Sequence, residues 1–117
     1  MSLERDAMLL RIFIGEDDKS RERRPLYEAI VMKARERGLA GATLLRGAMG
    51  FGHSSRIHTT KILRLSEDLP LVIEIVDTEE KIKAFLPMLD EMMPSGLVTL
   101  EKVQVLYYGK HVRHEPA

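Results

Sequence analysis

The stretch Leu71-Val-Ile-Glu-Ile-Val-Asp-Thr-Glu-Glu-Lys81 decides how this chain folds. Its first six residues are apolar with one exception and rich in β-branched side chains, which is typical of a strand. The acidic turn that follows offers an N-cap and negative charge, and both favour the start of a helix. Apolar residues then recur at helical spacing, at Ile82, Phe85, Leu86 and Leu89. The stretch therefore predicts a strand that runs directly into an amphipathic helix.

The sequence after this helix predicts its end and one more strand. Pro94 and Gly96 are expected to terminate the helix, because neither residue type continues one readily. The last strand is expected over residues 97–108. Its apolar positions change parity between Leu100 and Val103, which indicates a β-bulge near residues 101–102.

The first part of the chain repeats this plan. Ile12-Phe-Ile-Gly-Glu-Asp-Asp-Lys19 also runs from a strand, expected over residues 8–14, into an acidic turn. Pro25 suits the first position of a helix, and Gly38 suits a left-handed residue at its end. A second strand is expected over residues 42–46.

Two strand–helix–strand units in one chain favour a ferredoxin-like βαββαβ sandwich, an α+β class in which one antiparallel sheet carries two helices on one face. A fully parallel sheet is disfavoured, because two helices are too few to cover both of its faces. Residues 60–65 are expected to extend the strand that leads out of the middle of the chain. The expected organisation is an N-terminal extension over residues 1–7, one domain over 8–108 and a tail over 109–117.

The composition is that of one folded domain. The chain has 117 residues, and its 18 basic residues equal its 18 acidic ones, which argues against a broadly basic nucleic-acid-binding surface. Cysteine is absent, so neither disulfides nor thiolate metal sites are expected. No apolar run approaches the roughly 20 residues that span a bilayer, and no secretory signal is visible. We expect a cytoplasmic protein that is not embedded in a membrane and binds no nucleic acid.

The expected strands are apolar on both of their sides. In the first strand Leu10 and Ile12 alternate with Leu9 and Phe13, and the strand around Val72 follows the same pattern. Two helices cover only one face, so the other face would expose a large apolar surface. We infer that a second subunit covers this face; the alternative is that the C-terminal segment folds over it.

Residues 46–61 combine glycines with cationic and hydroxyl side chains. Glycine lets a backbone turn closely around an anion, while Arg, Lys and hydroxyl groups supply charge and hydrogen bonds. The spacing matches neither the Walker pattern nor the dinucleotide fingerprint, so a small anionic ligand and a loop without a ligand both remain open. The candidate ligand-binding residues are Arg46, Gly47, Gly50, Gly52, His53, Ser54, Arg56, His58, Thr59 and Lys61.

The same segment has two other interpretations. His53 and His58, with the acidic residues 16–18, contain metal-ligating groups, but their spacing matches no zinc motif and we assign no metal ligand. Ser54 or Ser55 near His58 could form a nucleophile–base pair, but the sequence has neither a G-x-S-x-G elbow nor an obvious acid to orient the histidine. We therefore expect no catalytic residue and no enzyme. Asp17 and Asp18 are expected to accept backbone hydrogen bonds in the turn before the first helix.

Several of these stretches carry a family resemblance. The run Arg46-Gly-Ala-Met-Gly-Phe-Gly-His53, followed by Ile73-Glu-Ile-Val-Asp-Thr-Glu-Glu-Lys81, is similar to the PII-like group, which includes nitrogen-regulatory PII proteins and CutA. Together with Arg11-Ile-Phe-Ile-Gly-Glu-Asp-Asp18 and Gly38-Leu-Ala-Gly-Ala42, it resembles an uncharacterised bacterial and archaeal PII-like family over about residues 8–107.

This resemblance implies a homotrimer whose sheets face inward, with clefts between the subunits. In PII proteins these clefts bind adenine nucleotides, so AMP, ADP or ATP is the expected regulatory ligand. The loop over residues 47–61 is expected to contact a protein partner such as a membrane transporter. Pro94-Ser-Gly-Leu-Val98 stands where PII proteins have a glycine- and lysine-rich turn that grips phosphates, which favours AMP or ADP over ATP. The alternatives are a CutA-like trimer that binds a divalent metal and a small hydrolase.

Overall fold

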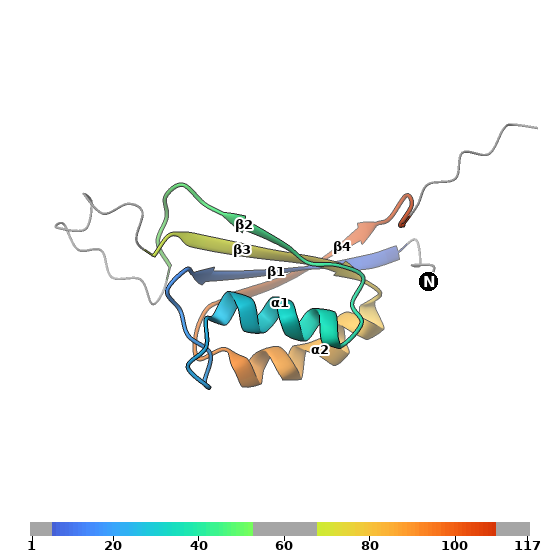
Figure 1. Ribbon diagram of the computed structural model, residues 1–117. Coiled ribbons are helices and arrows are strands. Elements are labelled where there is room, and N and C mark those ends of the chain that lie inside the picture. The colour runs from blue at the N-terminus through green and yellow to red at the C-terminus, as the bar shows by residue number, and fades with distance from the viewer. Residues whose placement is uncertain (1–5, 53–67, 110–117) are drawn as a thin grey trace, which may run out of the picture.

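The structure, a computed structural model, describes residues 6–52 and 68–109. The elements in these ranges are β1 (Asp6–Gly15), α1 (Leu26–Glu36), β2 (Thr43–Arg46), β3 (Pro70–Asp77), α2 (Glu79–Met92) and β4 (Leu97–Gln104). The strands form one sheet in the order β2-β3-β1-β4, and every neighbouring pair is antiparallel. Both helices lie on the same face of this sheet (Figure 1). The predicted ferredoxin-like βαββαβ arrangement is confirmed.

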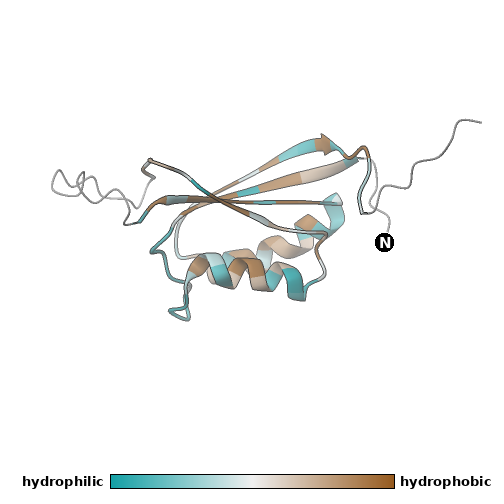
Figure 2. Cartoon of the chain, turned by 45° about the horizontal axis from the view of Figure 1, so that its top comes forward, coloured by the Kyte–Doolittle hydropathy of each residue, from teal (hydrophilic) through white to brown (hydrophobic). Residues whose placement is uncertain are grey.

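The hydrophobic core lies between the sheet and the two helices. Alternate residues of β1 and β3 point to the helices, and each helix contributes one apolar side at a spacing of three or four residues. In Figure 2 the strands carry long hydrophobic stretches with hydrophilic segments between them, the helices show both colours, and the loop between β1 and α1 is largely hydrophilic. The core includes Leu10, Ile12, Ile14, Leu71, Ile73 and Ile75 of the sheet and Leu26, Ile30, Ala34, Ile82, Phe85 and Leu89 of the helices.

The first helix begins one residue later than predicted and ends as predicted. Pro25 is the N-cap, with a φ of −52° and an extended ψ of 121°, because the proline ring fixes φ but leaves ψ free to remain outside the helix. At the other end Gly38 has a φ of 73°. Its N–H donates to the Arg35 carbonyl, and the Leu39 N–H donates to the Ala34 carbonyl, which is the paired bonding of a Schellman motif.

The N-cap of the second helix is Thr78, whose hydroxyl accepts a hydrogen bond of 3.3 Å from the Lys81 N–H. The preceding residue, Asp77, is completely buried. Its Oδ1 accepts from the Thr78 N–H at 2.7 Å, and its Oδ2 accepts from the Ala40 N–H at 2.8 Å. Asp77 therefore joins the end of β3 to both the start of α2 and the loop before β2.

Changing Asp77→Ala is expected to lower the free energy of unfolding by about 2–3 kcal/mol, because two partly buried N–H groups lose their carboxylate acceptor. Asp90→Ala, at an exposed position of α2, removes the same charge and is expected to change it by less than about 0.5 kcal/mol. Urea unfolding of both variants measures the difference. Equal losses in the two variants would show that these two hydrogen bonds do not stabilise the fold.

The last strand differs from its prediction in length and in pairing. β4 ends at Gln104, and its pairing with β1 runs one to one from Asp6↔Gln104 to Phe13↔Leu97, so the predicted bulge near residues 101–102 is wrong. β4 is an edge strand, and all but one of its residues are exposed. Because neither side is buried within the subunit, apolar residues can occupy both parities without a change of register.

No element of the described ranges covers the face of the sheet away from the helices (Figure 1). The strand registers place Phe13, Val72, Leu45 and Leu97 on this face, and Leu45 and Leu97 are 48% and 57% exposed. The described part of the C-terminal segment leaves them exposed, while the Tyr108 hydroxyl donates to the Ala40 carbonyl at 2.6 Å. We call this surface the open face. Within residues 6–52 and 68–109, no helix is long and apolar enough to cross a membrane.

Candidate functional site

The start of the glycine-containing loop lies at one end of the sheet. Because neighbouring strands are antiparallel, β1 and β2 end where β3 and β4 begin. The loop leaves β2 at this end, beside the acidic turn that follows β1. The acidic turn, the start of the loop and the first residues of β3 and β4 therefore meet at this end of the sheet.

The first glycines of the loop lie directly on Pro70 at the start of β3. The Gly47 N–H donates to the Pro70 carbonyl at 2.7 Å, so this N–H already has an acceptor within the subunit. An added Cβ on Gly47 would lie 2.8 Å from Pro70 Cγ, and one on Gly50 would lie 3.1 Å from the same atom. These glycines allow the loop to pack against the proline ring, which a larger side chain would obstruct.

The acidic turn after β1 is held by two carboxylates. Asp18 Oδ2 accepts from the Gly15 N–H at 2.9 Å, and Asp68 Oδ1 accepts from the Asp17 N–H at 3.0 Å. An added Cβ on Gly15 would lie only 2.5 Å from Asp68 Oδ1, so the glycine permits this close approach. The predicted role in accepting backbone hydrogen bonds is confirmed for Asp18, whereas Asp17 contributes its backbone N–H as a donor.

Arg46, the last residue of β2, pairs with this turn. Its Nη2 lies 2.5 Å from Glu16 Oε2, and its side chain is 56% exposed. An ion pair with this exposure contributes little to stability, but it places a carboxylate beside the guanidinium. Within the subunit, the positive charge of Arg46 is therefore already compensated.

A cleft of about 370 Å³ lies between the loop, the end of β1 and the first residues of β3 and β4. Its walls are largely apolar and include Phe51, which is 76% exposed, while carboxylates contribute its charged groups. A mostly apolar cavity with a few polar groups is typical of a small-molecule site. The residues that line it are Phe13, Ile14, Gly15, Asp18, Gly50, Phe51, Gly52, Asp68, Pro70, Leu71, Gly96 and Leu97.

The predicted ligand-binding residues fall into three groups. Gly50 and Gly52 line the cleft, whereas Arg46 and Gly47 lie at the base of the loop without lining it. The others lie outside the described residues: His53, Ser54, Arg56, His58, Thr59 and Lys61. The described lining carries Asp18 and Asp68 and no basic side chain, so binding of an anion remains a prediction that depends on the later part of the loop.

Sequence reasoning missed several lining residues. Phe51 was overlooked because polar side chains dominate this loop, although an aromatic residue between two glycines is itself a signal of an exposed contact. Asp68 is brought to the cleft by tertiary structure, and its φ of 51° marks an unusual turn that no pattern indicated. Gly96 was interpreted only as a helix terminator, yet it has a φ of 137° and lines the cleft.

Gly96→Ala is expected to lower the free energy of unfolding by about 2–3 kcal/mol, because L-residues rarely adopt this backbone conformation. The added Cβ would also lie 3.1 Å from the Phe13 carbonyl oxygen and 2.5 Å from Met93 Cε. Gly41→Ala is the matched control, since nothing lies within 4 Å of an added Cβ there. Thermal unfolding of both variants separates them, and similar melting temperatures would contradict the expectation.

A metal site receives no support from the described residues. Among residues 6–52 and 68–109, no group of three or more His, Asp or Glu side chains is arranged to hold a metal ion. His53 and His58, on which the CutA-like alternative depends, lie outside these ranges. The acidic groups near the cleft are engaged in the turn and with Arg46.

The sequence matches a family model over residues 7–105, that of DUF190, described as "Uncharacterized ACR, COG1993". A UPF0166 protein of Aquifex aeolicus is 46% identical over 99 residues, which cover 85% of this chain and 92% of the relative. The UPF0166 protein MJ1524 of Methanocaldococcus jannaschii is 36% identical over 105 residues, which cover 89% and 94%. The match extends over nearly the whole length of these relatives.

Solved structures show the same fold. A protein of Thermus thermophilus, described as a PII-like signaling protein, matches with a TM-score of 0.58 at 19% identity. The match covers 90% of this chain and 93% of the Thermus chain. CPII of Thiomonas intermedia K12, bound to ADP and bicarbonate, matches with a TM-score of 0.55 at 20% identity. That match covers 86% of this chain and 88% of the CPII chain. The predicted resemblance to PII-like proteins is therefore confirmed at the level of fold.

Proposed function

The chain belongs to the DUF190 family, and from this membership and its PII-like fold we propose that it is a regulatory homotrimer that binds an adenine nucleotide at clefts between its subunits. The observation that carries this proposal is that the cleft and the open face share a wall. Phe13 of β1 pairs with Leu97 of β4, both belong to the open face, and both line the cleft. A neighbouring subunit that covers the open face would also close the cleft.

The chemistry of the cleft suits the base of a nucleotide better than its phosphates. Phe51 and Leu97 offer apolar surface for a planar ring, and aromatic side chains favour stacking. Asp18 and Asp68 can accept hydrogen bonds from amino or hydroxyl groups but repel phosphate. The phosphates would then require cationic side chains from outside this lining, for which Arg56 and Lys61 are the candidates.

Related structures support this class of ligand. CPII of Thiomonas intermedia K12 has been solved with ADP and bicarbonate, and also with ADP, AMP and bicarbonate or acetate. In the present chain Pro94-Ser-Gly-Leu-Val98 has no basic residue to grip a triphosphate. AMP and ADP are therefore the favoured ligands, and ATP is the weaker candidate.

Ligand binding would regulate the loop over residues 47–61. Its first glycines pack on Pro70 beside the cleft, and Gly50 and Pro70 both line the cleft. A ligand in the cleft would therefore contact the base of the loop. A ligand that favours one loop conformation shifts the population toward it. In this proposal the ordered loop then binds or releases a protein partner such as a membrane transporter. The protein acts in the cytoplasm and has no catalytic activity of its own.

Native mass spectrometry of freshly purified protein, followed by calorimetric titration with AMP, ADP and ATP, tests the proposal. A trimer that retains or takes up AMP or ADP is the expected result. A stoichiometric metal ion in place of a nucleotide would favour the CutA-like alternative, and hydrolysis of the nucleotide would favour the hydrolase. A stable monomer at micromolar concentration would overturn the proposed trimer. An absence of binding heat with all three nucleotides would overturn the proposed nucleotide ligand.

A further inference from the structure

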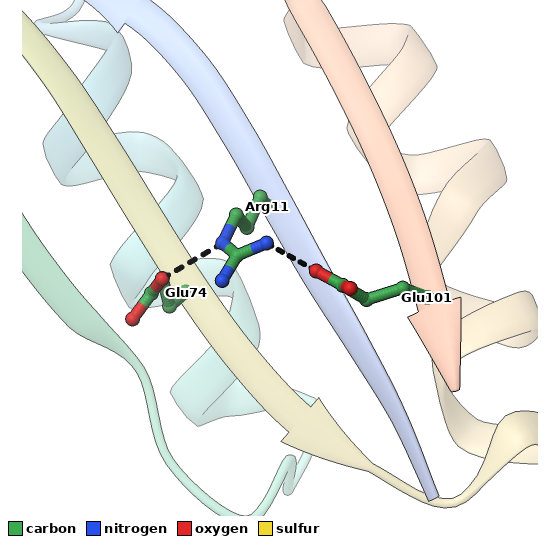
Figure 3. A network of polar contacts seen from close by, with 3 residues as sticks. All are labelled: Arg11, Glu74 and Glu101. Atoms are coloured by element: carbon green, nitrogen blue, oxygen red, sulfur yellow. Dashed lines mark hydrogen bonds and ion pairs between the residues drawn. The ribbon is translucent and has the colours of Figure 1, made fainter. Parts of the chain in front are cut away.

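One polar cluster interrupts the apolar surface of the open face. Arg11 of β1 lies between Glu74 of β3 and Glu101 of β4, and the three side chains form one network across the sheet (Figure 3). The strand registers place no other charged side chain of the described strands on this face. We call these three residues the open-face network.

The two contacts of Arg11 use different nitrogen atoms. Its Nε donates to Glu74 Oε2 at 2.9 Å, while its Nη1 donates to Glu101 Oε1 on the other side. The hydrogen bond to Glu74 is the main reason that the pKa of Arg11 is raised, with Glu101 adding to the effect. The side chains of Arg11, Glu74 and Glu101 are 37%, 32% and 55% exposed in the subunit, so water still reaches all three.

The network does not balance its own charge. One guanidinium faces two carboxylates, which leaves one negative charge in excess. While the face is open, water compensates this charge at little cost. If the face becomes covered, an uncompensated charge in the contact costs several times more than one in solvent.

The occupant to which these observations point is a second copy of the chain. Apart from this network and Thr43 and Thr99, the residues that the strand registers place on the open face are apolar, so two such faces complement each other. In the described sheet β2 and β4 are the edge strands, and they offer pairing to a neighbour that presents strands. Identical copies bring identical networks with the same excess charge. Assembly therefore brings negative charges together that the copies cannot neutralise for one another.

We propose that the excess negative charge of the open-face network limits how tightly the subunits associate. This inference rests on the proposed assembly through the open face. It gives each residue a distinct effect. Loss of the Glu101 charge balances the network and strengthens association, whereas loss of the Arg11 charge leaves two carboxylates unpaired and weakens it.

The test compares the wild type, Glu101→Gln and Arg11→Met by fluorescence-detected sedimentation velocity from micromolar to picomolar concentration. Glu101→Gln is expected to lower the concentration of half-dissociation by about tenfold, and Arg11→Met to raise it by at least about tenfold. The matched control is Glu79→Gln, which changes the net charge identically but removes an exposed partner of Lys83 on α2. The concentration of half-dissociation of Glu79→Gln is expected to remain within about twofold of the wild-type value.

The outcomes separate the inference from the proposal beneath it. A wild type that assembles, with Glu101→Gln equal to Glu79→Gln or weaker than the wild type, overturns the role of the network and leaves the assembly standing. A wild type and a Glu101→Gln variant that both remain monomeric at micromolar concentration overturn the assembly itself. Circular dichroism of Arg11→Met shows whether the variant is folded. If Arg11→Met is unfolded, the direction of the Glu101→Gln effect alone decides whether the network limits association.

Discussion

Replacing Val72 by lysine is expected to abolish assembly while the isolated subunit stays folded. Val72 lies on the open face, opposite Phe13 in β1 and Leu45 in β2. In a free subunit the lysine can extend its ammonium group into water. In an assembly that covers this face, the ammonium would be buried without a partner, at a cost of several kcal/mol. The dissociation constant should rise by about a thousandfold or more.

Met32→Lys is the matched control for this experiment. Met32 lies on α1 and is 56% exposed, so the same apolar-to-cationic change falls on the helical side of the subunit. Light scattering coupled to size-exclusion chromatography measures the mass of each variant, and circular dichroism checks that each is folded. If Val72→Lys and Met32→Lys elute with the mass of the wild-type assembly, the open face is not the contact between subunits.

The sequence contained enough information to predict the elements that bury one side. The stretch from Leu71 onward became β3, and its alternate residues entered the core opposite Leu10 and Ile12. The apolar stripe that begins at Ile82 became the buried side of α2. Such patterns are readable because burial imposes a period of 2.0 on a strand and about 3.6 on a helix. Gly38 was equally readable, because a left-handed end of a helix favours glycine.

Prediction was wrong where burial imposes no period. β4 is exposed on both sides in the subunit, so the change of parity between Leu100 and Val103 carried no information about register. A bulge was the wrong explanation for residues that simply occupy both sides of an edge strand. The start of α1 was misplaced for a different reason. Pro25 fits both the N-cap and the first helical position, and only its ψ distinguishes them.

The candidate site was only partly predictable because its parts come from distant segments. The sequence showed that Gly47 and Gly50 belong to an unusual loop, but not that both would lie against Pro70. Asp68 meets the acidic turn across about fifty residues of chain, through the hydrogen bond from the Asp17 N–H, which depends on the folded sheet. Local composition identified the loop, while the cleft beside it arose from tertiary packing.

The loop glycines give the second prediction of a large effect. Gly50→Val is expected to weaken binding of AMP or ADP by about a hundredfold, or about 3 kcal/mol. The Cβ of the new side chain would already lie 3.1 Å from Pro70 Cγ, so its γ-methyl groups must displace the part of the loop that lines the cleft. Gly52→Ala is the control, because Gly52 also lines the cleft but an added Cβ meets nothing within 4 Å. We expect it to bind within about threefold of the wild type, since open space accommodates the methyl group without strain.

Arg56→Ala distinguishes a ligand site from a loop that is merely well packed. If Arg56 contacts a phosphate, its loss should weaken binding at low salt and matter less at high salt, because salt already screens exposed charges. Calorimetric titration of AMP, ADP and ATP at two ionic strengths measures this difference, and urea unfolding reports stability in parallel. A loop that only packs against Pro70 predicts the opposite pattern. Gly50→Val would then lower stability and leave affinity unchanged, and Arg56→Ala would change neither. That result would mean that the nucleotide does not bind at the loop, and would leave the loop as a surface for a protein partner.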